Sequence, residues 1–344
     1  MERYDRQRKV GTSGARLDER LAQTTALLIG VGGTGSPLAA SLVRAGIGSL
    51  IMLDPDAVNE TDLARQTLYF SDDAARGATK VTRAVEELGR IGGRTRVEGH
   101  PLALTPMNAA SWIANVDLVF DATDHLPARG WIDDACRAEG VPWIHLAAIE
   151  DRWFVIPFLH PSGPCFRCYS PLDTPVSQLG TCETRGVLPA ATQLAAAHGA
   201  AAFWSWLGGD EGEADHRTIV RGRIGEPGAR VSTLPFDPNC PVCGAARRGS
   251  DAETGFRVIC GKSRLEGWSK IDRGALLDRL ETAVDWQLDP DRGSDVVRAR
   301  SAKERLTVFP DGRVIYGPID DLERAEARVR ALITPDLDPT PRSR

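Results

Sequence analysis

Residues 26–46 read ALLIGVGGTGSPLAASLVRAG and form the most informative pattern in the chain. An apolar run is followed by glycines in the pattern G-x-G-x-x-G, at Gly30, Gly32 and Gly35, and then by an Ala/Leu-rich segment. The pattern predicts a strand, a tight turn and the start of a helix, because glycine lets the backbone approach a phosphate without an intervening Cβ. The free N–H groups at that helix start favour an anion.

A second apolar run, residues 49–53, ends at Asp54, which follows Gly35 by 19 residues. A carboxylate at this spacing binds ribose hydroxyls in nucleotide-binding α/β folds. The motif therefore predicts an adenine nucleotide but leaves NAD, FAD and ATP open. Strand and helix patterns alternate up to about residue 150, which predicts a doubly wound, Rossmann-like parallel sheet. A β-like run at 153–159 predicts an antiparallel extension of that sheet.

Length and composition set the broad class of the protein. A chain of 344 residues is long enough for roughly two domains. The net charge of −5 does not point to nucleic acid or anionic membranes as partners. No apolar run approaches the roughly 20 residues that a membrane span needs, and the charged start of the chain does not read as a signal peptide. We therefore expect a cytoplasmic protein, whose seven cysteines are metal ligands or nucleophiles rather than disulfides.

Two C-x2-C pairs predict a zinc site. The ligands would be Cys165, Cys168, Cys240 and Cys243, with 71 residues between the two pairs. Four thiolates complete a tetrahedral shell and leave no position for substrate, so we expect a structural site that joins distant segments. The alternative is four free surface thiols.

A further cysteine, Cys182, lies in a polar loop bounded by glycine and proline and followed by a helix pattern. Such a loop exposes a thiol, and the nearby Arg185 would favour its thiolate. The residues alone leave two interpretations open, a nucleophile or an inert small residue. Cys136 falls inside a predicted helix and is expected to be a buried apolar filler.

The domain boundaries follow from composition. We predict a nucleotide-binding α/β domain over 1–245 that includes the four-cysteine site, a linker over 246–255, a small α+β domain over 256–333 and a disordered tail over 334–344. Residues 208–230 are expected to form a surface loop, and residues 58–77 a second loop.

The whole motif set resembles the ubiquitin-activating-enzyme-like adenylyltransferases of the ThiF/MoeB/HesA type over about residues 1–245. The resemblance is carried by residues 3–7 (RYDRQ), Gly30–Gly35, 53–56 (LDPD), 63–66 (LARQ), Lys80, 120–124 (FDATD), the two C-x2-C pairs and Cys182 before 186–188 (GVL).

The resemblance implies ATP rather than NAD, with Mg²⁺ and Zn²⁺. Such enzymes join the C-terminal glycine of a ubiquitin-like or sulfur-carrier protein, ending in Gly-Gly, to AMP. A thioester or sulfur step on a cysteine then follows. The implied nucleotide-binding residues are Gly30, Gly32, Gly33, Gly35, Asp54, Asp56, Arg65, Gln66, Lys80 and Asp124. The implied catalytic residues are Arg65, Asp124, Cys182 and Arg6, the last reaching the partner subunit of a homodimer.

Several readings stay open beside this one. The chain departs from the family at Asp62 and His125, where asparagine is usual, and a carboxylate at 62 would repel phosphates unless it is metal-bound or turned away. The output is either sulfur-carrier activation or a bacterial conjugation pathway that uses a conjugating enzyme. The alternatives of another class are an NAD-dependent oxidoreductase and a non-catalytic scaffold that binds the carrier.

Overall fold

The structure is a computed structural model. It describes residues 3–11, 13–124, 126–159, 163–170, 185–209, 218–240, 242–244, 257–258, 265–269, 271–283, 285–288, 296–309, 312–318 and 322–333. The chain divides into two compact units, one of residues 1–104 and 108–250, the other of 105–107 and 251–344. The predicted linker 246–255 and the predicted tail 334–344 lie outside the described residues, as do Cys182, His125 and Cys260.

The first unit is built on an eight-stranded sheet of order β3-β2-β1-β4-β5-β6-β7-β8. Its strands are β1 (Thr25–Ile29), β2 (Ser49–Leu53), β3 (Arg96–His100), β4 (Leu118–Asp121), β5 (Trp143–Ile149), β6 (Arg152–Phe158), β7 (Thr218–Arg223) and β8 (Arg230–Thr233). The first five strands along the chain are parallel, and β6, β7 and β8 extend them antiparallel. The predicted Rossmann-like sheet with an antiparallel extension is confirmed.

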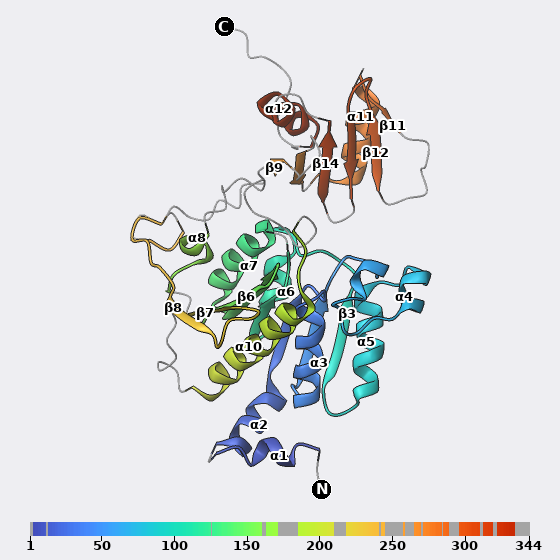
Figure 1. Ribbon diagram of the computed structural model, residues 1–344. Coiled ribbons are helices and arrows are strands. Elements are labelled where there is room, and N and C mark those ends of the chain that lie inside the picture. The colour runs from blue at the N-terminus through green and yellow to red at the C-terminus, as the bar shows by residue number, and fades with distance from the viewer. Residues whose placement is uncertain are drawn as a thin grey trace. The chain divides into compact units, whose positions relative to one another are not determined.

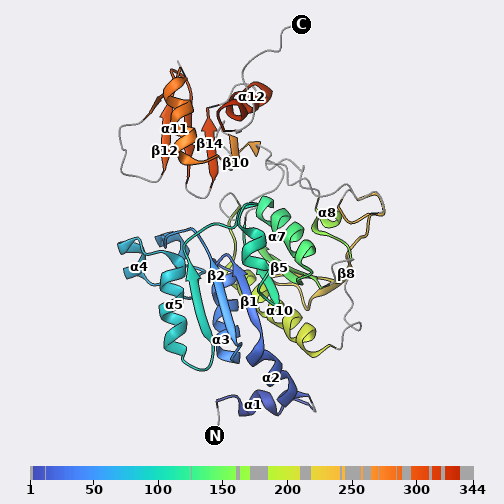
Figure 2. The same ribbon diagram turned by 180° about the vertical axis from the view of Figure 1, so that it is seen from behind.

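Helices cover both faces of this sheet (Figures 1 and 2). They are α1 (Asp5–Arg8), α2 (Gly14–Gln23), α3 (Gly35–Ala45), α4 (Ser71–Arg76), α5 (Lys80–Ile91), α6 (Ala109–Ile113), α7 (Leu126–Glu139), α8 (Phe166–Tyr169) and α10 (Pro189–Gly208), with a 3-10 turn η1 (Glu60–Asp62). Helices α3, α5 and α10 bury their apolar sides in one cluster, and α6, α7 and α8 bury theirs in another.

The alternation of side chains along each strand explains the two clusters. In β1, Ala26 and Leu28 pack with α3, α5 and α10, whereas Leu27 and Ile29 pack with α6 and α7. Because every second residue of a strand points to the same face, an uninterrupted apolar run is what a sheet buried on both faces requires. Burial of each leucine or isoleucine side chain among these contributes roughly 1.5–3 kcal/mol.

The strand order reverses between β1 and β4, and the chain leaves both strands at the same edge of the sheet. Ligands of open α/β sheets bind in the crevice at such a switch point, beyond the carboxyl ends of the strands. The glycine turn follows β1 and the Ala122–Asp124 segment follows β4. The topology therefore brings the two segments together.

Two sequence predictions in this unit were wrong. Residues 208–230 include β7, of which only Ile219 is buried, so its apolar alternation is too weak to stand out. Residues 58–77 include the helix α4, whose sole buried residue is Asp73. Both elements are stabilised by the segments of the same chain that pack against them, and not by an apolar pattern of their own.

The second unit pairs a six-stranded antiparallel sheet with two helices. Its elements are β9 (Arg257–Val258), β10 (Leu265–Trp268), α11 (Arg273–Thr282), β11 (Gln287–Leu288), β12 (Val297–Arg300), β13 (Arg305–Val308), β14 (Arg313–Gly317) and α12 (Leu322–Ile333), with strand order β11-β12-β13-β14-β10-β9. Among the residues that the structure describes, no helix in either unit has the length and apolar character of a membrane span.

Candidate nucleotide site and metal centre

The glycine turn packs directly on the segment that follows β4. Gly30 has φ +88°, and a Cβ there would lie 2.8 Å from the carbonyl oxygen of Ala122. A Cβ at Gly35 would press on the carbonyl of Gly30. These two glycines are therefore needed for the turn itself. Gly32 and Gly33 instead face side chains, because a Cβ there would contact Gln66 or Arg65.

Asp54 braces the turn from the end of β2. One carboxylate oxygen accepts the N–H of Val31 at 2.7 Å and the other accepts the N–H of Asp56 at 2.9 Å. Burial raises the pKa of Asp54, while the positive charge of Lys80 and the two N–H groups work in the opposite direction. The predicted ribose acid thus lies beside the turn, and it also fixes the turn's backbone.

Asp62, singled out in the sequence only as a departure, is the centre of the neighbouring cluster. Its carboxylate accepts the backbone N–H of Asn59 at 3.1 Å and the side-chain amide of Gln66 at 2.7 Å. The guanidinium of Arg65 lies 3.4 Å away and also donates to the Thr61 carbonyl at 2.7 Å. The carboxylate caps the η1 turn and holds Arg65 and Gln66, so it is turned into the protein.

Lys80 completes this cluster as the first residue of α5. Its Nζ lies 3.0 Å from Asp56 and 3.6 Å from Asp62, and its side chain is only 8% exposed. Burial opposes the charge on Lys80, but Asp54, Asp56 and Asp62 outweigh that effect and raise its pKa. A charged lysine is therefore held beside the glycine turn by carboxylates.

The cluster fits a polyphosphate. The turn offers close backbone approach and a helix N-terminus, and two cations lie next to it. Both cations are already paired with carboxylates, so a bound phosphate would take over contacts that Asp56 and Asp62 make now.

Asp124 is exposed just beyond β4, and a buried pair holds the chain before it. Asp121 accepts the N–H and the hydroxyl of Thr123 at 2.9 and 2.7 Å, and its other oxygen lies 2.7 Å from Nδ1 of His145. Burial opposes ionisation of Asp121, but His145, Arg129 and the Thr123 hydroxyl lower its pKa. Burial and the charge of Arg129 lower the pKa of His145, and the neighbouring Asp121 only partly offsets them.

Arg6 is not part of this cluster. It is exposed in α1, and none of the hydrogen bonds or ion pairs among the described residues involves its side chain. Helix α1 lies at the C-terminal end of α3, where a Cβ on Gly46 would be 2.6 Å from the ring of Tyr4. The glycine turn is at the other end of this 11-residue helix, about 16 Å away.

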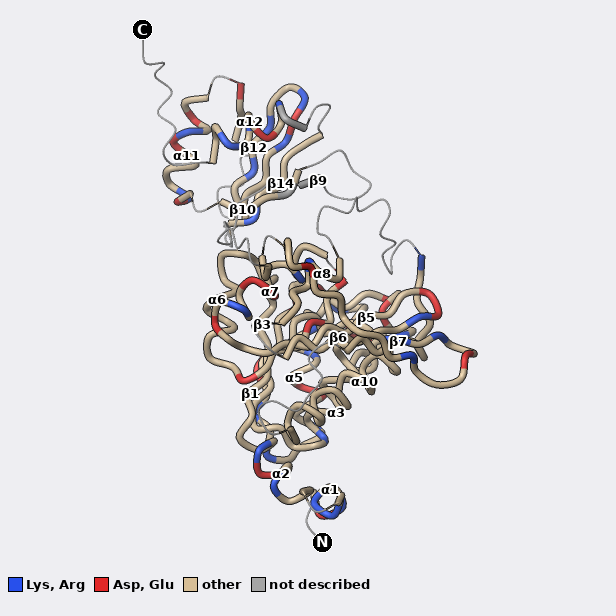
Figure 3. The backbone as a smooth tube through the Cα atoms, turned by 90° about the vertical axis from the view of Figure 1, so that its left-hand side faces the viewer, with Lys and Arg blue, Asp and Glu red and all other residues tan. Residues whose placement is uncertain are grey.

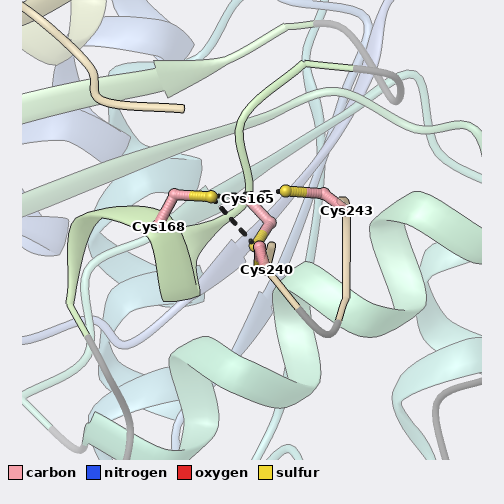
Figure 4. Close-up of side chains that lie close together, drawn as sticks. All are labelled: Cys165, Cys168, Cys240 and Cys243. Atoms are coloured by element: carbon pink, nitrogen blue, oxygen red, sulfur yellow. Dashed lines mark hydrogen bonds between the residues drawn. The ribbon is translucent and has the colours of Figure 1, made fainter. Parts of the chain in front are cut away.

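The four predicted zinc ligands converge (Figure 4). Their sulfur atoms all lie within 4.8 Å of one another, with 3.5 Å between Cys165 and Cys240 and 3.3 Å between Cys168 and Cys243. A tetrahedral ion with Zn–S bonds of about 2.3 Å needs sulfur atoms about 3.8 Å apart, so the four thiols fit zinc. Cys136 is buried, as its position in a helix predicted.

The loop that carries Cys182 lies outside the described residues, and only its end is seen. Arg185, expected to favour the thiolate, lies 3.2 Å from the carboxylate of Glu150. The charge of Arg185 is therefore already engaged by an acid from the β5–β6 hairpin.

Comparison with known proteins identifies the family. Residues 4–242 match the ThiF family. The chain belongs to the ThiF family. It is 28% identical over 330 residues to the sulfur carrier protein ThiS adenylyltransferase of Bacillus subtilis, a match that covers 94% of this chain and 97% of that protein. It is 33% identical over 252 residues to the sulfur carrier protein adenylyltransferase of Thermus thermophilus, covering 71% and 91%. The SAMP-activating enzyme E1 of Haloferax volcanii is 31% identical, covering 71% and 89%.

Solved structures support the fold of this ThiF-family chain. The crystal structure of E. coli MccB with ATP matches with a TM-score of 0.61 and 21% identity, covering 71% of this chain and 74% of MccB. At that identity the match speaks for the fold alone. The predicted class, a ThiF/MoeB-type adenylyltransferase, is confirmed by the family match and the names of the relatives.

Proposed function

We propose that this ThiF-family protein uses ATP and Mg²⁺ to adenylate the C-terminal glycine of a ubiquitin-like or sulfur-carrier protein that ends in Gly-Gly. The supporting observation is the pair of carboxylate-held cations, Arg65 and Lys80, beside the glycine turn. It occurs in a chain that is similar over 94% of its length to a sulfur carrier protein adenylyltransferase.

Different residues of the chain have different roles in this reaction. When bound, ATP supplies the adenylyl group that the glycine carboxylate accepts as pyrophosphate leaves. The backbone of the glycine turn accommodates phosphate oxygens, and Asp54 fixes that backbone through Val31. Lys80 and Arg65 neutralise the charge of the departing phosphates, because preorganised cations in a partly buried site cost no reorganisation during the reaction. Asp124, exposed just beyond β4, would hold the Mg²⁺ ion, which would supply further positive charge to the phosphates.

The second copy of a homodimer would supply Arg6. Within one chain, Arg6 and the glycine turn lie at opposite ends of α3. Arg6 would therefore contact the nucleotide site of the other subunit and not that of its own chain. Cys182 is proposed as the thiol that then attacks the acyl-adenylate and forms a thioester as AMP leaves, or that takes part in sulfur transfer. Zinc on the four cysteines would join the segment after β6 to the segment after β8, a structural role that metal analysis and unfolding in chelator would test.

Of the two outputs, sulfur-carrier activation has more support, since two of the relatives described above are named for sulfur carriers. The SAMP-activating relative keeps a conjugation pathway, with its conjugating enzyme, as the second candidate. An NAD-dependent oxidoreductase has no counterpart among those three relatives.

The proposal is tested by ATP–pyrophosphate exchange with candidate carrier proteins. We expect exchange that requires a carrier with an intact Gly-Gly end, and its loss in Asp124→Ala. Mass spectrometry of the same mixture should find a reducible adduct on Cys182. Exchange that is absent with every carrier tested would refute adenylation, and full carrier-dependent function of Asp124→Ala would favour a non-catalytic scaffold.

A further inference from the structure

The sheet of the second unit has two faces of different chemistry. One face presents buried apolar residues, among them Val297, Leu306 and Val314, and packs with the buried sides of both α11 and α12. The residues that alternate with these point to the other face. Because both helices of the unit contribute to the apolar cluster, no described helix of this unit covers that second face.

The second face is rich in arginine. Among the described side chains, this face carries Arg298, Arg300, Arg305 and Arg313. Figure 3 colours the basic and acidic residues along the backbone. Arg298, Arg300 and Arg305 are exposed, and no carboxylate of the described part of the chain forms an ion pair with any of them.

The pairing register sets two of these charges against each other. Arg300 on β12 lies directly opposite Arg305 on β13, and Arg305 is opposite Gly317 on β14. Like charges in opposed positions destabilise a sheet, and an anion bound between them removes the repulsion. The glycine adds no side chain, so the surface is hollow beside the pair. The resulting groove of about 350 Å³ is lined by Arg298, Ala299, Arg300, Arg305, Leu306, Thr307, Ile315 and Gly317.

The lining indicates what kind of anion fits. Half-buried Ile315 lies two strands from Arg298, with Thr307 between them in the same row across the sheet. Guanidinium groups bind carboxylates through paired N–H donors, and arginine together with apolar side chains is typical of protein interfaces. None of the lining residues is aromatic, so the groove has no platform on which a nucleic-acid base could stack.

We propose that this arginine groove docks an acidic segment of a partner protein, with carboxylates at Arg298, Arg300 and Arg305 and an apolar side chain on Ile315. The proposal rests on the proposed function in one respect, which is that it takes the carrier protein to be this partner. The chain as a whole has a net charge of −5, so an acidic partner is repelled on average and attracted where uncompensated arginines gather.

Binding is tested on the full chain without the carrier. The probe is a fluorescein-labelled peptide of repeating Glu-Glu-Leu, measured by fluorescence anisotropy. The comparison ligands are the same peptide with Gln in place of Glu, and single-stranded DNA of equal charge. We expect the acidic peptide to bind and the Gln peptide not to bind. Arg300→Glu should weaken the acidic peptide about tenfold, as loss of a charge-assisted contact does.

The matched control is Arg330→Glu, which makes the same charge change on the exposed surface of α12 and should leave binding unchanged. Three results would each overturn the proposal: no binding of the acidic peptide, equal weakening by both variants, or tighter binding of the DNA. The last would point to a nucleic-acid surface instead.

A second measurement separates this proposal from the proposed function. The peptide assay needs neither ATP nor a Gly-Gly end, so it judges the groove even if no carrier supports pyrophosphate exchange. With a carrier that does support exchange, Arg300→Glu should raise KM for the carrier about tenfold and leave kcat unchanged. An unchanged KM would assign the groove to a different partner and refute the carrier as its occupant.

Discussion

Two regions of this protein concentrate basic side chains and treat their charges in opposite ways. Beside the glycine turn, Lys80 lies 3.0 Å from Asp56, and Arg65 lies 3.4 Å from Asp62. In the arginine groove, Arg298, Arg300 and Arg305 have no carboxylate partner among the described residues.

Burial explains the difference. The side chain of Lys80 is 8% exposed, and a charge withdrawn from water is costly unless a counter-charge accompanies it. The groove arginines are exposed, so water can solvate them and the fold tolerates their repulsion. The first region therefore holds its cations in place with carboxylates, whereas the second leaves its arginines exposed to water.

The largest expected effect comes from removing a compensated cation. Lys80→Ala should lower ATP–pyrophosphate exchange by about 10²–10³-fold, because the phosphates lose a preorganised positive charge. Lys9→Ala is the control, since Lys9 also pairs with an aspartate, Asp5, at 2.7 Å, but on the surface. Equal losses of exchange in the two variants would show that Lys80 contributes no more to the reaction than a surface lysine does.

A third cluster surrounds the buried carboxylate of Asp18 and predicts that the stability of the fold depends on pH. Burial raises the pKa of Asp18, but hydrogen bonds from Arg94, Arg8 and Gln7 outweigh it and lower the pKa to about 2, from 3.8. A carboxyl whose pKa falls on folding stabilises the fold above its unfolded pKa, and the contribution is lost as the pH falls through 2. The shift corresponds to a contribution of about 2 kcal/mol to the free energy of unfolding at neutral pH.

Asp18→Asn should therefore lower stability by about 2 kcal/mol at pH 7, with the difference vanishing near pH 2. Urea unfolding at both pH values measures it. Asp72→Asn, which removes an exposed pair at 3.5 Å with Arg76, should change little. A loss in Asp18→Asn that persists at pH 2 would show that shape rather than charge is responsible.

Asp62→Asn tests the role of Asp62, because it keeps the size of the side chain and removes its charge. We expect a loss of about 1 kcal/mol, since the η1 cap and the bonds to Gln66 and Arg65 weaken. KM for ATP should fall, because Arg65 loses its carboxylate partner and Lys80 keeps only Asp56. A higher KM with unchanged stability would mean that Asp62 contacts the nucleotide or its metal directly.

The smallest effect is expected in the uncompensated region. Arg300→Glu places opposite charges across from each other at Arg305 and should stabilise the second unit by about 0.5 kcal/mol. Thermal unfolding of the two proteins measures this difference in stability. Destabilisation by Arg300→Glu would show that the paired arginines already have a counter-charge.

Much of the fold could be predicted because its signals are local. The glycine turn, the continuous apolar run of β1 and the spacing within each C-x2-C pair are set by the sterics of a few neighbouring residues. Elements without an apolar pattern were missed. β7 buries one residue and α4 only an aspartate, so their positions depend on the strands and turns next to them.

The candidate site was predicted in part. Arg65, Lys80 and Asp54 were predicted from the motifs in which they occur. Asp62 was recognised only as a departure from the family pattern. The Asp121–His145 pair was not predicted. A polar residue at the end of an apolar strand was the available signal for Asp121, and His145 lies within another apolar strand.

The strand–turn–helix unit, the alternation of strands and helices, and the two C-x2-C pairs can be recognised in the sequence, because each is encoded within a few residues. Which charged side chains contact one another depends on the folded arrangement of distant segments. Lys80 reaches Asp62, Asp121 reaches His145, and Arg300 comes to lie opposite Arg305, because strand register and helix packing fix these distances. Whether a charge is neutralised or left free depends on those distant neighbours and on how much water reaches it.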